Sequence, residues 1–221
     1  KKQSGAEIET VVFDFSPKQM NNIVKSAWNN SRFVGIYGQH LPNYLAQKYF
    51  VADYQTKHNI SKIFEFKSLI QKNHLNNDID LKNIYLFDLN IMWTKQFGSR
   101  LAFSNWSKRF KKIHIISGNA NKVKEKGIED FAPHAEFVFT NCDRPIYGIN
   151  HRNELIKKFD ERSYGCDLVL FGTGKVMKDL GTILSVKHSL IAVDMGSVLD
   201  CWAGIREREY FINGPYEYLF D

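Results

Sequence analysis

The sequence predicts an α/β protein with a Rossmann-like, mostly parallel sheet flanked by helices, and with a helical N-terminal portion. In the second half of the chain, apolar runs of strand length alternate with helical stretches. Runs such as residues 168–171 and 190–193 are apolar throughout, which is typical of strands buried on both faces. The 221 residues are 43% apolar, enough for one buried core. We therefore expect a single domain over residues 1–221, excised from a longer protein because the chain opens without an initiator Met.

The first half of the chain opens its regular structure at Ser16-Pro17. Ser16 suits the N-cap position and Pro17 the first helical position, and apolar residues then recur at helical spacing up to Asn29-Asn30. Residues 32–37 are typical of a strand, and residues 41–58 of a helix. The stretch 60–75 fits either a strand or a helix, and 76–82 is a polar loop.

The second half is more regular. Strands are expected at residues 83–89, 112–116, 136–140, 167–171 and 189–194, and helices at 98–110, 120–126, 150–161 and 175–186. The carboxyl ends of parallel strands meet at one edge of a sheet, and ligands bind there. Small and polar residues that directly follow the strands are therefore the candidate site residues.

Composition excludes some classes of protein and leaves others open. Thirty Lys and Arg against 24 Asp and Glu give a net charge of +6, which suits an anionic partner or simply a solvated basic surface. The three cysteines form no Cys-x-x-Cys, so we expect reduced thiols. The seven histidines lack zinc-ligand spacing, and no apolar run approaches the ~18 residues of a membrane span. No metal-ligating residues are predicted.

The most informative motif is Gly172-Thr173-Gly174-Lys175, at the end of a buried strand. Glycines here let a ligand approach the backbone, Thr173 offers a hydroxyl, and Lys175 offers a charge for phosphate. A Walker A loop is excluded because Val176 follows the lysine. Asp194 lies 22 residues after Gly172 (194 − 172), as in a dinucleotide fingerprint, although Met177 occupies the third glycine position. A plain tight turn is the alternative.

Further candidates follow the other strands. Asp194 and Gly196 end one strand, where an acid serves a ribose hydroxyl or a proton transfer, or else caps the next helix in competition with Ser197. Asp200 is either a catalytic base or a surface carboxylate. Ser117-Gly118-Asn119 is a small, polar stretch at another strand end, with Gly118 as its predicted binding residue. Asn141 and Arg144 follow a further strand, and Arg144 suits a bidentate phosphate contact or is an exposed turn residue. Asp88 is a buried carboxylate or a site residue.

Residues 168–205 resemble the C-terminal part of bacterial glycosyltransferases of the GT-D fold. In that family a strand leads to a glycine turn and a helix, and the next strand ends in an aliphatic–Asp–aliphatic–Gly motif, here Val193-Asp194-Met195-Gly196. The looser resemblance extends over roughly residues 16–205. It implies a Rossmann-like fold, a nucleotide-diphosphate sugar as donor, and a surface-glycan or lipid-linked acceptor.

The N-terminal motif departs from the family pattern. The family's first strand typically ends in Arg-Tyr-Gly-Asp-Gly-Glu, whose Asp-x-Glu pair binds a divalent metal such as Mn²⁺ or Mg²⁺. Here Tyr37 and Gly38 are present, but Gln39-His40-Leu41 follows and both acids are missing. The departure implies metal-independent transfer, a relocated metal site, or a domain that is no longer catalytic.

The leading prediction is a bacterial glycosyltransferase of polysaccharide biosynthesis, cytoplasmic or peripheral at the inner face of the plasma membrane. Its predicted catalytic residues are Asp194 and Asp200, one of them the base. Its predicted nucleotide-sugar-binding residues are Tyr37, Gly38, Gly118, Asn141, Arg144, Gly172, Thr173, Gly174, Lys175 and Gly196. The alternatives are a non-catalytic sugar-nucleotide or glycan-binding module and an NAD-dependent oxidoreductase, and nucleic acid is a distant fourth choice of partner.

Overall fold

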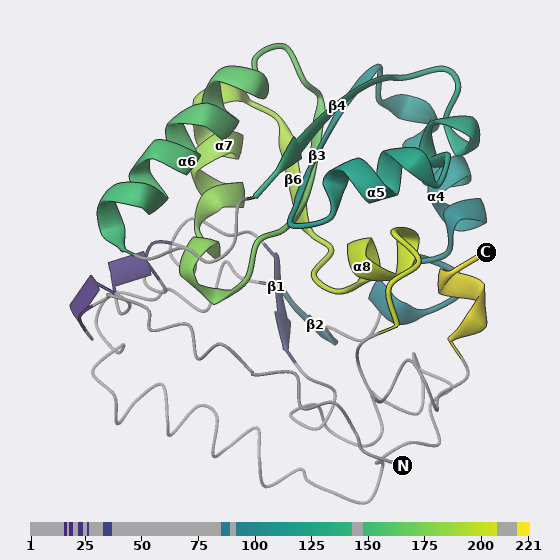
Figure 1. Cartoon of the computed structure of the whole chain (residues 1–221), viewed down its shortest axis with the longest axis horizontal. Coiled ribbons are helices and arrows are strands. Elements are labelled where there is room, and N and C mark those ends of the chain that lie inside the picture. The colour runs from purple at the N-terminus through teal and green to yellow at the C-terminus, as the bar shows by residue number, and fades with distance from the viewer. Residues whose placement is uncertain are drawn as a thin grey trace, which may run out of the picture.

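The chain forms a four-stranded, all-parallel sheet with helices on both faces (Figure 1). The computed structural model describes residues 16, 18–19, 22–23, 26, 33–36, 85–88, 92–142, 148–206 and 216–221. The strands are β3 (Lys112–Ser117), β4 (Glu136–Asn141), β5 (Leu168–Gly172) and β6 (Ile191–Asp194), in the order β4-β3-β5-β6. The predicted α/β, Rossmann-like fold is confirmed.

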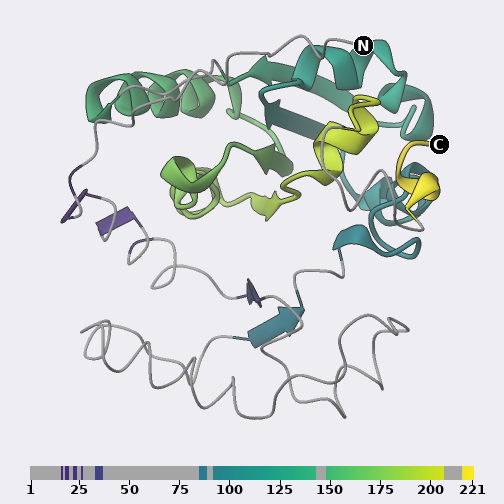
Figure 2. The same cartoon turned by 60° about the horizontal axis from the view of Figure 1, so that its bottom comes forward.

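Between residues 92 and 221 the described chain forms five α-helices and several short 3₁₀ turns. The helices are α4 (Arg100–Trp106), α5 (Ala120–Glu125), α6 (Ile149–Arg162), α7 (Leu180–His188) and α8 (Val198–Trp202). The 3₁₀ turns are η4 (Ser107–Arg109), η5 (Ile128–Phe131), η6 (Lys175–Met177) and η7 (Glu217–Leu219). Helices α6 and α7 cover one face of the sheet, and α5 and α8 cover the other (Figures 1 and 2).

The two faces bury two separate cores because side chains alternate along each strand. On the α5 and α8 side, Ile115 and Leu170 pack with Phe103 and Trp202. On the α6 and α7 side, the core residues include Ile116, Leu155, Phe159, Val169, Phe171, Leu180 and Leu184. Every residue of β5 is buried, as its unbroken apolar run predicts. The three cysteines are buried and form no disulfide bond.

One predicted helix is divided in two. A continuous helix was expected over residues 175–186, whereas η6 ends at Met177 and α7 begins at Leu180. The cause is a contact from α6, where Arg152 donates from Nε to the Val176 carbonyl at 2.8 Å and pairs through Nη2 with Asp179, the N-cap residue of α7. A guanidinium that binds this carbonyl and this carboxylate interrupts the helical ladder between them.

The N-terminal portion is described in short pieces. Ser16 Oγ accepts a hydrogen bond from the Gln19 amide, and the Ser16 amide donates to Gln19 Oε1, a reciprocal pair that starts the predicted helix at residue 16. Strands β1 (Phe33–Ile36) and β2 (Tyr85–Asp88) pair in parallel, with Ile36 opposite Asp88. The stretches predicted at 41–58, 60–75 and 76–82 lie outside the described residues.

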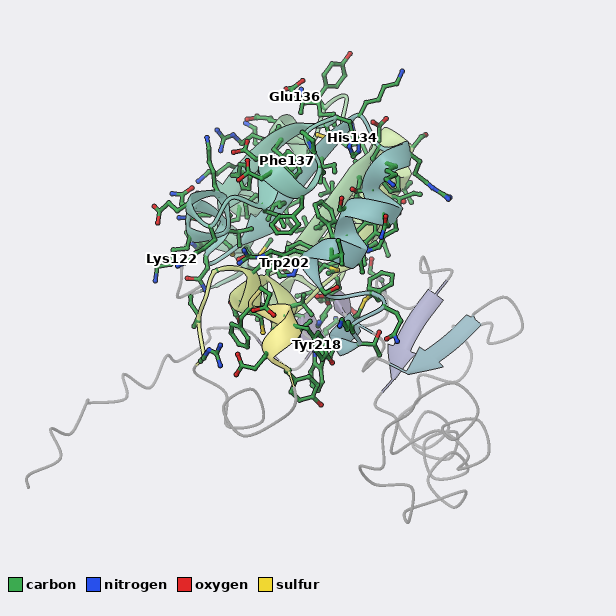
Figure 3. The ribbon with its side chains drawn as sticks, turned by 90° about the vertical axis from the view of Figure 1, so that its right-hand side faces the viewer. Lys122, His134, Glu136, Phe137, Trp202 and Tyr218 are labelled. Carbon is green, nitrogen blue, oxygen red and sulfur yellow. The ribbon has the colours of Figure 1, made fainter. Side chains whose placement is uncertain are left out.

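The C-terminal turn η7 closes the core next to α8. Leu219 is fully buried with Cys201, and the Tyr218 hydroxyl donates to the Trp93 carbonyl at 2.6 Å. Figure 3 shows Trp202 inside the body of the domain and Tyr218 at the C-terminal end of it. The last six residues therefore belong to the packed structure.

We expect Leu219→Ala to lower the free energy of unfolding by about 2 kcal/mol, because the methyl groups leave a cavity against Gly98 and Cys201. Urea unfolding measures this loss. Leu101→Ala is the control, since Leu101 is 67% exposed and its removal changes stability by less than ~0.5 kcal/mol. Equal losses in the two variants would contradict the assigned packing.

Candidate functional site

The carboxyl ends of the four strands lie side by side along one edge of the sheet. Ser117 at the end of β3 pairs with Asn141 of β4 on one side and with Gly172 of β5 on the other, and Phe171 pairs with Asp194 of β6. From β3 the chain moves outward to β4, and from β5 it moves outward in the opposite direction to β6. Ligands of open parallel sheets bind at such a switch point.

This edge collects most of the candidate residues that the structure describes. Asn141, Gly172 and Asp194 end their strands, and Gly118, Thr173, Gly174, Lys175 and Gly196 follow within three residues of a strand end. Tyr37, Gly38 and Arg144 lie outside the described residues. Asp88 is the last residue of β2 and lies opposite Ile36 of β1.

Thr173 has a buried hydroxyl at the switch point. Its side chain is 4% exposed, and its Oγ1 has no hydrogen-bond partner among the described residues. Leaving a buried polar group unpaired costs about 1–3 kcal/mol. The next residue, Gly174, has a left-handed φ of 76°, and a Cβ placed there would meet nothing within 4 Å. A free donor beside an open backbone position is suited to a ligand oxygen.

Gly172 has a packing reason of its own. A Cβ at this position would lie 2.7 Å from the Gly196 carbonyl oxygen and 3.4 Å from Leu199 Cδ1. The turn after β6 therefore approaches the end of β5 closely, and only glycine admits it. The tight-packing alternative explains Gly172, whereas it leaves the Thr173 hydroxyl unexplained.

Asp194 closes the turn between β6 and α8. Its Oδ1 accepts a hydrogen bond from the Gly196 amide at 3.0 Å, and its Oδ2 pairs with Lys178 Nζ. Ser197 occupies the N-cap position of α8 without a side-chain capping bond. Sequence reasoning missed Lys178, although a lysine three residues after the glycine loop was a usable signal.

Asp200 is held by a residue from the end of a different strand. Asn119 Nδ2 donates to Asp200 Oδ1 at 2.9 Å, which joins the loop after β3 to the first turn of α8. Asn119 sits at the N-cap of α5 but its side chain does not cap the helix. Asn141 Oδ1 instead accepts from the Asn121 amide at 3.0 Å. Asn119 belongs to the Ser117-Gly118-Asn119 stretch that the sequence marks as small, polar and at a strand end, although only Gly118 was predicted to bind the nucleotide sugar.

Arg152 on α6 holds the segment that follows the loop after β5. Its guanidinium and the Asp179 carboxylate are each 7% exposed, and they bind η6 and the start of α7 to α6. Sequence reasoning did not find this pair, because the partners lie 27 residues apart and an arginine within a helix carries no pattern of its own.

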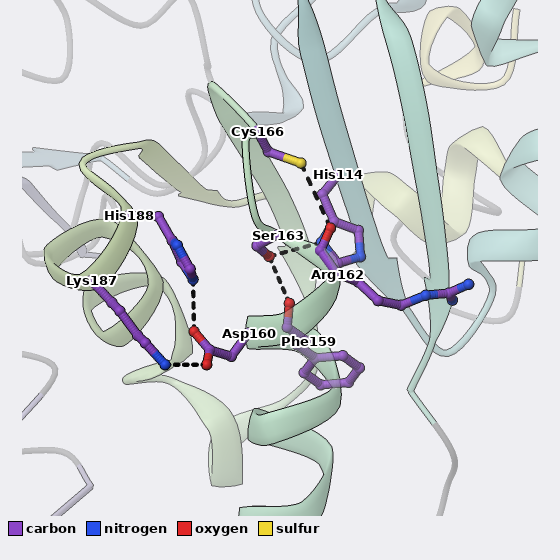
Figure 4. Close-up of polar contacts among 8 residues, drawn as sticks. All are labelled: His114, Phe159, Asp160, Arg162, Ser163, Cys166, Lys187 and His188. Carbon is purple, nitrogen blue, oxygen red and sulfur yellow. Dashed lines mark hydrogen bonds and ion pairs between the residues drawn. The ribbon is translucent and has the colours of Figure 1, made fainter.

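A second polar network lies beneath the sheet, between β3, β4 and the end of α6 (Figure 4). The Ser163 hydroxyl donates to the Phe159 carbonyl, so its oxygen accepts from His114 Nδ1 at 2.8 Å, and His114 Nε2 accepts from the Thr140 hydroxyl at 2.8 Å. Burial, assisted by the Arg162 charge, lowers the pKa of His114 to about 3. This histidine is neutral and fully paired, which makes it a structural residue.

Over the described stretches, no group of three or more His, Cys, Asp or Glu side chains is placed to hold a metal ion. In the same part of the chain, no helix has the length and apolar character needed to cross a bilayer. Comparison with models of protein families, with curated proteins and with solved structures gives no match to this chain.

Proposed function

We propose that the chain is a glycosyltransferase that moves a sugar from a nucleotide-diphosphate sugar to a bacterial surface-glycan or lipid-linked acceptor. The observation that carries the proposal is the buried, unpartnered Thr173 hydroxyl at the switch point of a parallel sheet. The resemblance of residues 168–205 to GT-D glycosyltransferases supports the choice of reaction. The proposed place of action is the cytoplasm or the inner face of the plasma membrane.

The donor diphosphate is the group that this edge suits best. In the proposed complex the Thr173 hydroxyl donates to a phosphate oxygen, and the absence of a side chain at Gly174 gives the phosphate access to the backbone. Lys178, 45% exposed and paired with Asp194, supplies positive charge nearby. Fixed donors and cations of this kind stabilise the negative charge that develops on a leaving diphosphate.

The dinucleotide alternative is less well supported. It requires the Asp194 carboxylate to bind the hydroxyls of a ribose. Both Asp194 oxygens are already engaged, one by the Gly196 amide and one by Lys178. A non-catalytic sugar-nucleotide-binding module would use the same donor site as the transferase. Turnover of a nucleotide sugar by the purified chain would exclude this second alternative.

A thermal-shift screen tests the proposal. We expect one nucleoside diphosphate or its sugar, among uridine, guanosine and thymidine compounds, to raise the Tm by roughly 5–10 °C at 100 times its Kd. The screen is run with Mn²⁺, with Mg²⁺ and with EDTA to determine the metal requirement, and NAD is included for the oxidoreductase alternative. A response to NAD alone would contradict the proposal.

Thr173→Val makes the screen specific to the site. The valine removes a buried unpaired hydroxyl, so we expect an unchanged or higher Tm without ligand and a loss of most of the ligand-induced shift. Ser107→Ala is the matched control, because Ser107 also has a buried hydroxyl without a partner in the described residues but precedes β3, at the opposite edge of the sheet. A full ligand response in Thr173→Val would place the ligand elsewhere.

A further inference from the structure

We infer that Asp200, and not Asp194, is the base that takes the proton of the acceptor hydroxyl, and that Asn119 is the residue that positions its carboxylate. The inference rests on the proposed glycosyl transfer and chooses between two carboxylates at the same edge of the sheet. The choice follows from what each carboxylate oxygen already binds.

Both oxygens of Asp194 already accept a contact from the protein. Oδ1 is used by the Gly196 amide in the turn that follows β6, and Oδ2 is used by Lys178. This turn also places the Gly196 carbonyl against Gly172. Asp194 therefore shapes the loop and holds Lys178, which is a structural role.

Asp200 has one oxygen held and one oxygen available. Oδ1 accepts from Asn119, whereas Oδ2 has no hydrogen bond or ion pair to another described residue, and the side chain is half-buried. A base needs this arrangement, since the bound oxygen fixes the rotamer and the other oxygen receives the proton.

Asp200 belongs to α8, the helix that packs against the end of β5 just before Thr173. Its neighbour Leu199 packs 3.4 Å from the Cβ position of Gly172, the residue before Thr173. Its partner Asn119 lies two residues after Ser117, whose register partner is Gly172, and neighbouring strands lie ~4.8 Å apart. Helix α8 is held in place because Trp202 Nε1 donates to the Gly98 carbonyl and Arg100 donates to the Trp202 carbonyl. The carboxylate is therefore presented from a fixed element.

The capping of α5 points to Asn119 as a dedicated positioning residue. Asparagine is among the best N-cap residues, yet the Asn119 side chain leaves its own helix uncapped and reaches Asp200 in α8. Asn141 on β4 supplies the capping oxygen instead. The free amide at the start of α5 is thus bound by Asn141 of the neighbouring strand, and the Asn119 side-chain amide is left to hold the Asp200 carboxylate.

In the proposed step, the acceptor hydroxyl oxygen forms a bond to the anomeric carbon of the donor sugar. The bond from that carbon to the β-phosphate oxygen breaks, and its electron pair leaves with the nucleoside diphosphate. The hydroxyl proton passes to Asp200 Oδ2 and from there to solvent. When water is the acceptor, the same step hydrolyses the donor.

The test measures nucleoside diphosphate released from the sugar donor that gives the largest thermal shift, with water as acceptor. We expect Asp200→Ala to lower kcat by about 10²–10⁴-fold while the Kd for uridine or guanosine diphosphate stays within about 2-fold. Formate should restore part of the lost rate, because a small carboxylate replaces the missing base. Glu125→Gln, an exposed carboxylate change on α5, is the control.

The variant Asn119→Ala shows whether Asn119 positions the Asp200 carboxylate or only stabilises the fold. We expect it to lower kcat by roughly 10-fold in the wild-type background and to have no further effect in the Asp200→Ala background, because Asn119 acts only through that carboxylate. Asp194→Asn should lower kcat by less than 10-fold. Circular dichroism checks that each variant is folded.

The outcomes separate the two proposals. Loss of turnover in Asp200→Ala with formate rescue supports the base assignment. If Asp200→Ala keeps more than a tenth of the wild-type rate, or if Asn119→Ala lowers the rate equally in both backgrounds, the inference is wrong while the proposed function stands. If no donor binds to or reacts with the wild-type chain, the proposed function fails and the inference fails with it.

Discussion

Asp179→Ala is expected to lower the free energy of unfolding by about 3–5 kcal/mol, and the Tm by roughly 10 °C. The substitution leaves the Arg152 guanidinium buried at 7% exposure without its carboxylate. An unpaired buried charge is costly, and the guanidinium would also release the Val176 carbonyl that it holds. Differential scanning calorimetry measures both the Tm and the enthalpy.

The same helix provides the control for this substitution. Lys157 and Glu161 on α6 form an exposed ion pair at 4.0 Å, with side chains 78% and 65% exposed. We expect Lys157→Ala to change stability by less than ~0.5 kcal/mol. The double change Arg152→Met with Asp179→Leu should recover most of the loss, because a pair of apolar side chains leaves no buried charge. A double variant as unstable as the single one would contradict the charge argument.

The second large effect is an acid destabilisation that originates at His114. The pKa of His114 is about 3 in the folded chain against 6.5 in the unfolded chain, so the unfolded state binds a proton first as the pH falls. The neutral His114 therefore contributes fully to the free energy of unfolding above pH 6.5. This contribution is lost progressively between pH 6.5 and pH 3, at about 1.4 kcal/mol per pH unit. By pH 4 the loss is about 3 kcal/mol.

His114→Gln isolates this contribution, since glutamine does not titrate. We expect the variant to be less stable than wild type at pH 7.5, and the difference to shrink as the pH falls to 4. Urea midpoints at several pH values measure the two curves. His134→Asn is the control, because His134 is exposed and its Nε2 contacts the Ser107 carbonyl. Parallel curves for wild type and His114→Gln would show that another group titrates.

The sequence was sufficient for the sheet because each strand is marked locally. Runs such as 168–171 are apolar, short and bounded by turn residues, and the predicted strand at 112–116 differs from β3 by one residue. The break between η6 and α7 could not be predicted in the same way. It depends on Arg152, which lies 27 residues from Asp179 in the sequence and meets it only through the tertiary fold.

The candidate site was likewise predictable only where its residues form a local sequence pattern. Thr173 and Gly174 were identified because a glycine loop directly after a buried strand is a local pattern. The difference between Asp194 and Asp200 lies in their partners, Lys178 and Asn119, which are 16 and 81 residues away. Two carboxylates that look equivalent in the sequence are thus distinguished by contacts that no local pattern encodes.

The contact between Gly98 and Trp202 has a consequence for modularity. These residues are separated by 104 positions, yet the Trp202 indole donates to the Gly98 carbonyl at 2.8 Å. Tyr218 makes a similar connection to Trp93, over 125 positions. The entry to and the exit from the four-stranded unit are therefore neighbours in space, as in domains that tolerate insertion into a host protein or circular permutation. In the described residues 92–142, 148–206 and 216–221, contacts at Gly98 and Trp93 therefore tie the beginning of this unit to its end.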